Sequence, residues 1–184
     1  MFTNPVISSD KQILVAYATR SGSTREVAEA VAAALVDKGI KNELKPAREV
    51  RTLAEYRAVI LGAPLYMFHW HRDALNFLSR HAADLAGLPL AIFALGPFHD
   101  EAQELQAARE QLDKDLLKFP WLKTATVQVF AGKFDPAKLG FPFRLLMALP
   151  ANPMRQMPFS DARNWPQIND WAAAIASELK EKIG

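Results

Sequence analysis

The chain contains no cysteine among its 184 residues. It therefore has no disulfide bond, no thiolate ligand for a metal and no cysteine nucleophile. Its first residues, MFTNPVISSDKQ, lack the basic start and apolar core of a secretory signal. The most apolar later run, LGFPFRLLMALP, is too short to span a bilayer and is interrupted by Pro142 and Arg144. These absences lead us to expect a soluble, cytoplasmic protein.

Basic charge is present but is not concentrated. The net charge is +2, and the lysines and arginines are scattered without a dense run. A dedicated nucleic-acid binder would gather its charge on one face or in one arm, so we expect no nucleic-acid partner. Half of the residues are apolar, which is enough for one good core in a chain of this length. We therefore expect a single domain over residues 1–184.

Short apolar runs alternate with helical patterns along the chain. Strands are predicted at 12–18, 58–64, 88–96 and 124–132, with a polar edge strand at 41–46, and helices at 22–38, 72–81, from about 100 and from about 165. The strand runs are continuously apolar, which predicts an α/β fold whose parallel sheet is covered by helices on both faces. Such sheets bind ligands beyond the carboxyl ends of their strands.

Several helix ends carry recognisable signals. Gly39 follows the first helical pattern, where a glycine often ends a helix. Asp100 and Gln103 resemble a capping box at the start of the third helix. Pro166 falls in the first turn of the last helix, a position that proline favours. These signals predict where the helices begin and end.

The first strand is followed by the hydroxyl-rich stretch ATRSGSTREV. Four hydroxyl side chains surround Gly22 before a helix: Thr19, Ser21, Ser23 and Thr24. Hydroxyls and unpaired amides at a helix N-terminus favour an anion. The stretch has neither GxxxxGK[ST] nor GxGxxG, so it suits one terminal phosphate. Alternatively, Ser23 or Thr24 simply caps the helix, and the neighbouring Arg20 and Arg25 either add positive charge or lie in solvent.

The pattern Thr-x-Ser-Gly-Ser-Thr after a first strand resembles the phosphate loop of the flavodoxin family. The order of elements extends this resemblance from about Gln12 to Lys182. It implies a flavodoxin-like three-layer sandwich with a five-stranded parallel sheet of order 2-1-3-4-5, and flavin mononucleotide (FMN) as cofactor. Thr19, Arg20, Ser21, Gly22, Ser23 and Thr24 would bind its phosphate.

The resemblance places the flavin ring between the loops at 63–71 and 95–100. The residues implied as ring contacts are Pro64, Leu65, Tyr66, Met67 and Phe68 in the first loop, and Leu95, Gly96, Pro97 and Phe98 in the second. Both loops offer flat or polarizable side chains and backbone amides, as an isoalloxazine requires. Alternatively, some of these aromatic residues pack beneath the next helix, Trp70 first among them.

The sequence HWH at 69–71 is the other unusual element. No acidic residue or cysteine completes a familiar metal set, so we expect no metal. The surrounding stretch is similar to the quinone-linked, protoporphyrinogen-oxidising branch of flavodoxin-like proteins, although Phe68 replaces a glycine and Tyr66 replaces a basic residue. That similarity makes His69 a candidate for proton transfer. His99, after the strand at 88–96, is a second candidate, or its ring faces water. Alternatively, the rings of His69 and His71 lie in solvent at a helix start.

The connection at 133–164 is long and rich in Phe, Leu, Met and Pro, which argues against simple disorder. It also looks like the extended connection of that same branch. Lys138, Arg144 and Arg155 among apolar residues could meet an anionic substrate or, through 139–157, the inner face of a membrane where quinones dissolve. Alternatively, the segment covers the core with Phe141, Phe143, Leu145 and Leu146.

Three functions follow from these patterns. The first is an FMN-dependent oxidoreductase that passes electrons from a small-molecule substrate, such as protoporphyrinogen IX, to a quinone. The second is an electron-transfer protein without a substrate of its own; the family's carriers are typically acidic, whereas this chain is basic. The third is a flavin-free binding module, against which the four hydroxyls count. The oligomeric state is not encoded in any of these patterns.

Overall fold

Five parallel strands form the central sheet of the protein. The computed structural model describes residues 11–66, 69–122, 125–135 and 159–183. The parallel strands are β1 (Gln12–Tyr17), β2 (Asn42–Pro46), β3 (Tyr56–Tyr66), β5 (Leu90–Leu95) and β6 (Thr126–Phe130). They lie in the order β2-β1-β3-β5-β6, so that the parallel strands, counted alone, follow the predicted 2-1-3-4-5. The predicted polar strand is β2, at one edge of the sheet.

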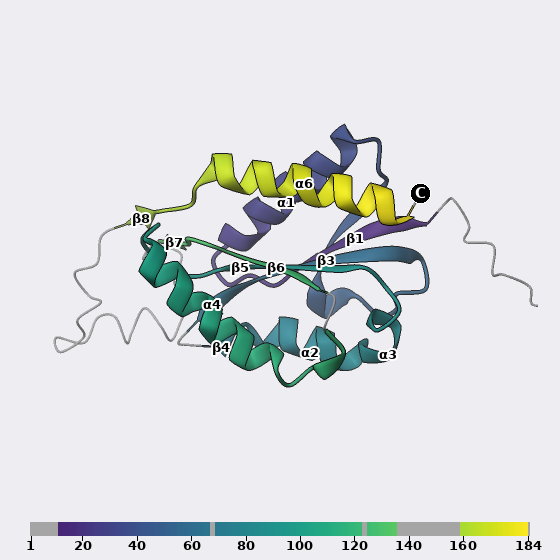
Figure 1. Ribbon diagram of the computed structural model, residues 1–184, viewed down its shortest axis with the longest axis horizontal. Helices are drawn as coiled ribbons and strands as arrows, with labels where there is room; N and C mark the ends of the chain where they lie inside the picture. The colour runs from purple at the N-terminus through teal and green to yellow at the C-terminus, as the bar shows by residue number, and fades with distance from the viewer. Residues whose placement is uncertain (1–10, 67–68, 123–124, 136–158, 184) are drawn as a thin grey trace, which may run out of the picture.

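Helices cover both faces of this sheet (Figure 1). One face packs against α1 (Ser23–Asp37) and α6 (Trp165–Ile183), and the other against α2 (Arg72–Arg80), α3 (Ala82–Leu85) and α4 (Ala102–Leu116). Two 3-10 turns, η1 (Ala47–Glu49) and η2 (Pro120–Leu122), complete the connections. Successive residues of a strand point to opposite faces, and both faces of β1 are buried. This explains why the strand runs are continuously apolar.

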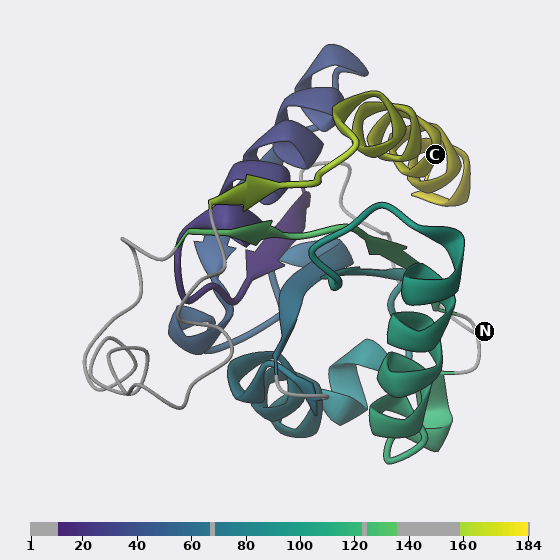
Figure 2. The same cartoon turned by 90° about the vertical axis from the view of Figure 1, so that its left-hand side faces the viewer.

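Three short strands lie at the carboxyl ends of the parallel strands (Figures 1 and 2). β4 (His69–Trp70) pairs antiparallel with the end of β3. β7 (Lys133–Phe134) pairs antiparallel with β8 (Ser160–Asp161). The two ends of the predicted 133–164 connection are therefore joined as a pair of strands. The residues proposed for substrate, membrane or core contact between 138 and 157 lie outside the described residues.

The helix ends confirm some of the predicted signals and correct one. Gly39 follows α1 with φ 74°, and its amide donates to the Val36 carbonyl at 2.8 Å. Pro166 lies in the first turn of α6, as predicted. The capping box at Asp100 is wrong, because α4 begins only at Ala102 and has no side-chain cap. The Asp100 carboxylate instead accepts a hydrogen bond of 3.1 Å from Asn164 Nδ2.

A glycine in the centre of the sheet admits an aromatic ring. A Cβ atom on Gly62 of β3 would lie 1.9 Å from the ring of Phe93 on β5. That ring also meets Trp171 of α6 edge to face, with 5.8 Å between centroids. The close approach requires glycine at this position.

Among the described residues, no helix is both long enough and apolar enough to cross a membrane.

Candidate functional site

The hydroxyl-rich stretch forms the turn from β1 into α1. Gly22 occupies the N-cap of α1 with φ 91°, a left-handed conformation that favours glycine, and no side chain caps the helix. The Gly22 amide donates to Thr19 Oγ1 at 2.9 Å. The alternative that Ser23 or Thr24 caps α1 is therefore wrong, because both residues lie inside the first helical turn. The hydroxyls of this loop are not used as helix caps.

Thr24 stands out within this loop. Its side chain is fully buried, yet Oγ1 has no hydrogen-bond partner among the described residues. The first amides of a helix also lack intrahelical acceptors. A buried hydroxyl without a partner costs free energy, and an anion bound at the start of α1 would accept hydrogen bonds from both kinds of group. This arrangement fits a terminal phosphate.

The two arginines of the loop behave differently. The guanidinium of Arg20 lies over the ring of Tyr66, 4.8 Å from its centroid. Arg25 forms an ion pair of 2.9 Å with Glu29 along the exposed face of α1. Arg20 thus brings the loop before α1 next to the end of β3, where the loop at 63–71 begins.

The loop at 63–71 is a hairpin. We call it the first ring loop and the loop at 95–100 the second ring loop, because the resemblance predicts that they contact the flavin ring. Leu65 pairs with Trp70 and Tyr66 with His69, while Met67 and Phe68 lie outside the described residues. Pro64, Leu65 and Tyr66 are half-buried. Trp70 is buried, and its Nε1 donates to the Ala63 carbonyl at 3.1 Å, which confirms that this aromatic residue packs inward.

A carboxylate from α4, which the sequence patterns did not single out, holds this hairpin. The Asp115 side chain is only 3% exposed and accepts a hydrogen bond of 2.8 Å from the Trp70 amide. Lys118 Nζ donates to it at 2.8 Å, and His69 Nδ1 lies 3.5 Å away. Burial alone would raise the pKa of Asp115, but the bonds from Lys118 and the Trp70 amide leave it below its ordinary value.

The two histidines of HWH have separate roles. The His69 side chain is 70% exposed beside Asp115. His71 is half-buried and caps α2, where its Nδ1 accepts a hydrogen bond of 3.2 Å from the Asp73 amide. Burial lowers the pKa of His71. In the part of the chain that the structure describes, no three His, Asp or Glu residues gather as metal ligands would.

The second ring loop follows β5. The Leu95 side chain is buried in the core, whereas Gly96, Pro97 and Phe98 are half-buried. The Phe98 ring meets Phe134 of β7 edge to face at 5.2 Å. His99 is exposed and lies 3.1 Å from Glu104.

This loop is fastened to the segments on either side of 136–158. The Gly132 amide donates to the Pro97 carbonyl at 2.7 Å, and the Ala162 amide donates to the Gly132 carbonyl at 3.1 Å. A Cβ atom on Gly132 would lie 2.9 Å from the Gly96 carbonyl oxygen, so glycine permits the close approach. The second ring loop and the β7/β8 pair therefore form one packed unit.

A second charged group that the sequence patterns missed lies beside the phosphate loop. The Arg163 side chain is only 2% exposed. Its guanidinium binds the Asp161 carboxylate at 2.6 and 2.7 Å, Glu26 at 2.7 Å and the Ser23 carbonyl at 3.2 Å. The bond from Arg163 is the main reason that the pKa of Asp161 is lowered. The stretch DARN before the last helix contained this residue, but nothing local indicated its partners.

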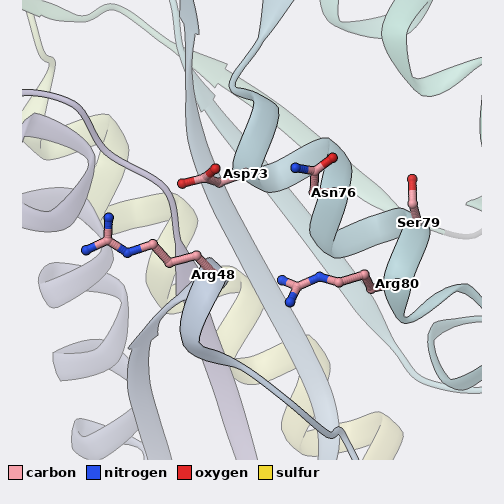
Figure 3. Close-up of a pocket in the computed structure, with 5 residues that line it drawn as sticks. All are labelled: Arg48, Asp73, Asn76, Ser79 and Arg80. Atoms are coloured by element: carbon pink, nitrogen blue, oxygen red, sulfur yellow. The ribbon is translucent and has the colours of Figure 1, made fainter.

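A surface groove lies between η1 and α2 (Figure 3). It is lined by Arg48, Asp73, Asn76, Ser79 and Arg80. Arg80 Nη2 donates to the Ala47 carbonyl at 3.1 Å. None of the described residues predicted for the phosphate or the ring lines this groove.

Known proteins match this chain in sequence and in structure. It is 29% identical over 84 residues to the protoporphyrinogen IX dehydrogenase (quinone) of Escherichia coli strain K12, covering 45% of this chain and 46% of that protein. It is 25% identical over 130 residues to the Leishmania major protein of that name, covering 69% of this chain and 48% of the other. The chain spans about half the length of these curated relatives.

Among solved structures, oxidised flavodoxin 2 of Bacillus cereus superposes with a TM-score of 0.53 at 19% identity, covering 93% of this chain and 99% of the other. At that identity the likeness shows the fold alone. The family model of the flavodoxin domain matches residues 14–159. With the strand order and the loop before α1, this match shows that the chain belongs to the flavodoxin domain family.

Proposed function

We propose that this protein is an FMN-dependent oxidoreductase. The observation that carries the proposal is the buried, unpartnered hydroxyl of Thr24 in the first turn of α1. Together with Thr19, Ser21, Ser23 and the amides around Gly22, it would hold the phosphate, with Arg20 adjacent. The ring would lie between Pro64–Phe68 and Leu95–Phe98. When bound, a flavin supplies the capacity to accept a hydride or electrons from a reduced organic substrate.

The substrate that we propose is protoporphyrinogen IX, with a quinone as electron acceptor. Both curated relatives carry these two molecules in their names. The chain's net charge of +2 suits an anionic substrate better than the acidic surface of a carrier would. The same names and charge make a substrate-free electron carrier the less favoured function.

His69 is the residue that we propose for proton transfer. It lies in the first ring loop, directly after Phe68, and its side chain is 70% exposed, so that substrate has access to it. The Asp115 carboxylate lies 3.5 Å from Nδ1 and keeps the ring near the hairpin. A proton released from the substrate would be accepted at the other ring nitrogen, Nε2.

The proposal is tested first by titrating FMN and riboflavin with the apo-protein and following flavin fluorescence. Wild type is expected to bind FMN more tightly than riboflavin. Thr24→Val removes a hydroxyl that has no partner among the described residues, so the apo-protein is expected to unfold at the same or a higher temperature while FMN binding weakens roughly tenfold. Ser177→Ala, on α6, is the control. Equal affinity of wild type for both flavins would remove the phosphate site.

Turnover is tested anaerobically with protoporphyrinogen IX and a menaquinone analogue. His69→Ala is expected to slow kcat about 100-fold and to leave FMN affinity close to that of wild type. His99→Ala tests the second candidate; because its ring is exposed and lies 3.1 Å from Glu104, we expect turnover close to that of wild type. Activity of His69→Ala equal to wild type would transfer the proton-transfer role elsewhere, and no turnover by FMN-loaded wild type would contradict the proposed substrate.

A further inference from the structure

Glu26 places a negative charge beside the phosphate loop. It lies in the first turn of α1, two residues after Thr24, and its side chain is 37% exposed. A carboxylate here would oppose an anion at the start of the helix, because like charges at short range repel and the local dielectric is below that of water. If the loop is to accept a phosphate, the negative charge of Glu26 needs a positive group that neutralises it.

Two cations from distant segments meet this carboxylate. Arg163 Nη2 lies 2.7 Å from Glu26 Oε2, and Lys133 Nζ lies 3.5 Å from Oε1. Although burial raises the pKa of Glu26, the bonds and charges of Arg163 and Lys133 outweigh burial and leave it lowered. Asp161 completes the group, 3.8 Å from Lys133. The four side chains form a cluster of two cations and two anions.

Arg163 is the fixed centre of this cluster. Asp161 binds both Nε and Nη2 of its guanidinium, and Trp165 lies under it with 4.8 Å from Cζ to the ring centroid. The remaining Nη1 donates to the Ser23 carbonyl, which belongs to the phosphate loop itself. A guanidinium held on three sides directs fixed charge and a hydrogen bond to this loop.

We propose that Arg163 is a positioning residue that gives the loop its selectivity for a phosphate-bearing flavin. It neutralises Glu26 and holds the Ser23 carbonyl, so that a dianionic phosphate is accepted at the start of α1. This inference rests on the proposed FMN function.

The test compares the affinities of FMN and riboflavin for four variants. Arg163→Met is expected to lower FMN affinity about tenfold and to leave riboflavin affinity within about twofold. Adding Glu26→Gln to it removes the uncompensated charge and is expected to restore most of the loss. Arg109→Met is the matched control. Arg109 lies on α4 and, like Arg163, binds a carboxylate, that of Asp113, and a backbone carbonyl, that of Val127. It is expected to leave the affinity ratio unchanged.

Glu26→Gln alone keeps Arg163 in place and is expected to raise the FMN-to-riboflavin affinity ratio a few fold, an increase that shrinks in high salt. This variant tests the proposal even if Arg163→Met does not fold. Equal losses of both flavins in Arg163→Met, failure of Glu26→Gln to restore FMN binding, or an unchanged ratio in Glu26→Gln would each overturn it. If wild type itself did not discriminate between the flavins, the proposed function would be what failed.

Discussion

The phosphate loop and the first ring hairpin lie at the same edge of the sheet but are held in different ways. In the phosphate loop, the Thr19 hydroxyl accepts a hydrogen bond from the amide of Gly22, three residues later, and the left-handed conformation of this glycine sets the turn. The hairpin at β4 depends on Asp115, which is 45 residues away from Trp70. The turn of the phosphate loop is set by its own residues, with Arg163 bound to the Ser23 carbonyl in addition, whereas the pairing of the hairpin is held by a buried charge on a distant helix.

This difference explains which mutations should matter most. A local turn is damaged by changing the residue whose backbone conformation it requires, and the rest of the fold is little affected. A buried charge with several partners ties separate elements together, so its removal affects stability more broadly.

Replacing Asp115, which holds the hairpin, should lower the free energy of unfolding more than any change in the phosphate loop. Asp115→Ala leaves the Trp70 amide without an acceptor, and we expect it to lower the free energy of unfolding by about 3 kcal/mol. Asp115→Asn keeps an oxygen for that amide and should cost about 1 kcal/mol. Urea unfolding measures both. Equal losses in the two variants would show that the hydrogen bond to Trp70 is not what holds the hairpin.

Gly22→Ala tests whether the turn of the phosphate loop depends on its own glycine. A side chain at φ 91° is strained even though no atom lies within 4 Å of the new Cβ, so we expect a loss of about 1 to 2 kcal/mol. FMN affinity should fall as well, whereas the NMR resonance of the Trp70 amide in the hairpin should not shift. A variant as stable as wild type would contradict the local control of this turn.

Acidification should weaken the hairpin region in two stages. Burial lowers the pKa values of His71 and His81 on either side of α2, so stability starts to fall below about pH 6.5, where the unfolded chain takes up protons first. The lowered pKa of Asp115 adds a second loss below about pH 4. His71→Asn, which retains a capping side chain, should reduce the first stage and Asp115→Asn the second.

Urea midpoints across pH measure these stages, and Asp161→Asn provides the comparison at the phosphate loop. The lowered pKa of Asp161 predicts that this variant changes only the stage below about pH 4. An effect of Asp161→Asn near pH 6 would contradict the separation of the two regions.

The smallest effect is expected at Lys118. It donates to Asp115, but its own side chain is 61% exposed, so solvent screens the pair. Lys118→Met should lower the free energy of unfolding by about 0.5 kcal/mol, which a chemical denaturation series can resolve. A loss as large as that of Asp115→Ala would show that the ion pair, and not the bond to Trp70, carries the anchoring.

The sequence predicted the parts of the fold that local patterns control. Continuous apolar runs predicted the parallel sheet, the family resemblance implied its strand order, and Gly39 marked the end of α1. The Asp100 prediction failed because a contact with Asn164, 64 residues away, competed with a local cap. Asp115 and Arg163 could not be singled out, since each looks like an ordinary charged residue until folding buries it among its partners.

The bond from Arg163 to Ser23 joins residues 140 positions apart, and this separation has a consequence for biosynthesis. Ribosomal synthesis adds roughly 5 to 20 residues per second, so the loop before α1 is made several seconds before the residue that completes its surroundings. A nascent chain that ends before Arg163 carries every hydroxyl of the loop and still lacks its guanidinium. If the chain binds FMN as proposed, it would acquire the flavin at the end of synthesis, although the hydroxyl residues proposed to hold the phosphate are among the earliest made.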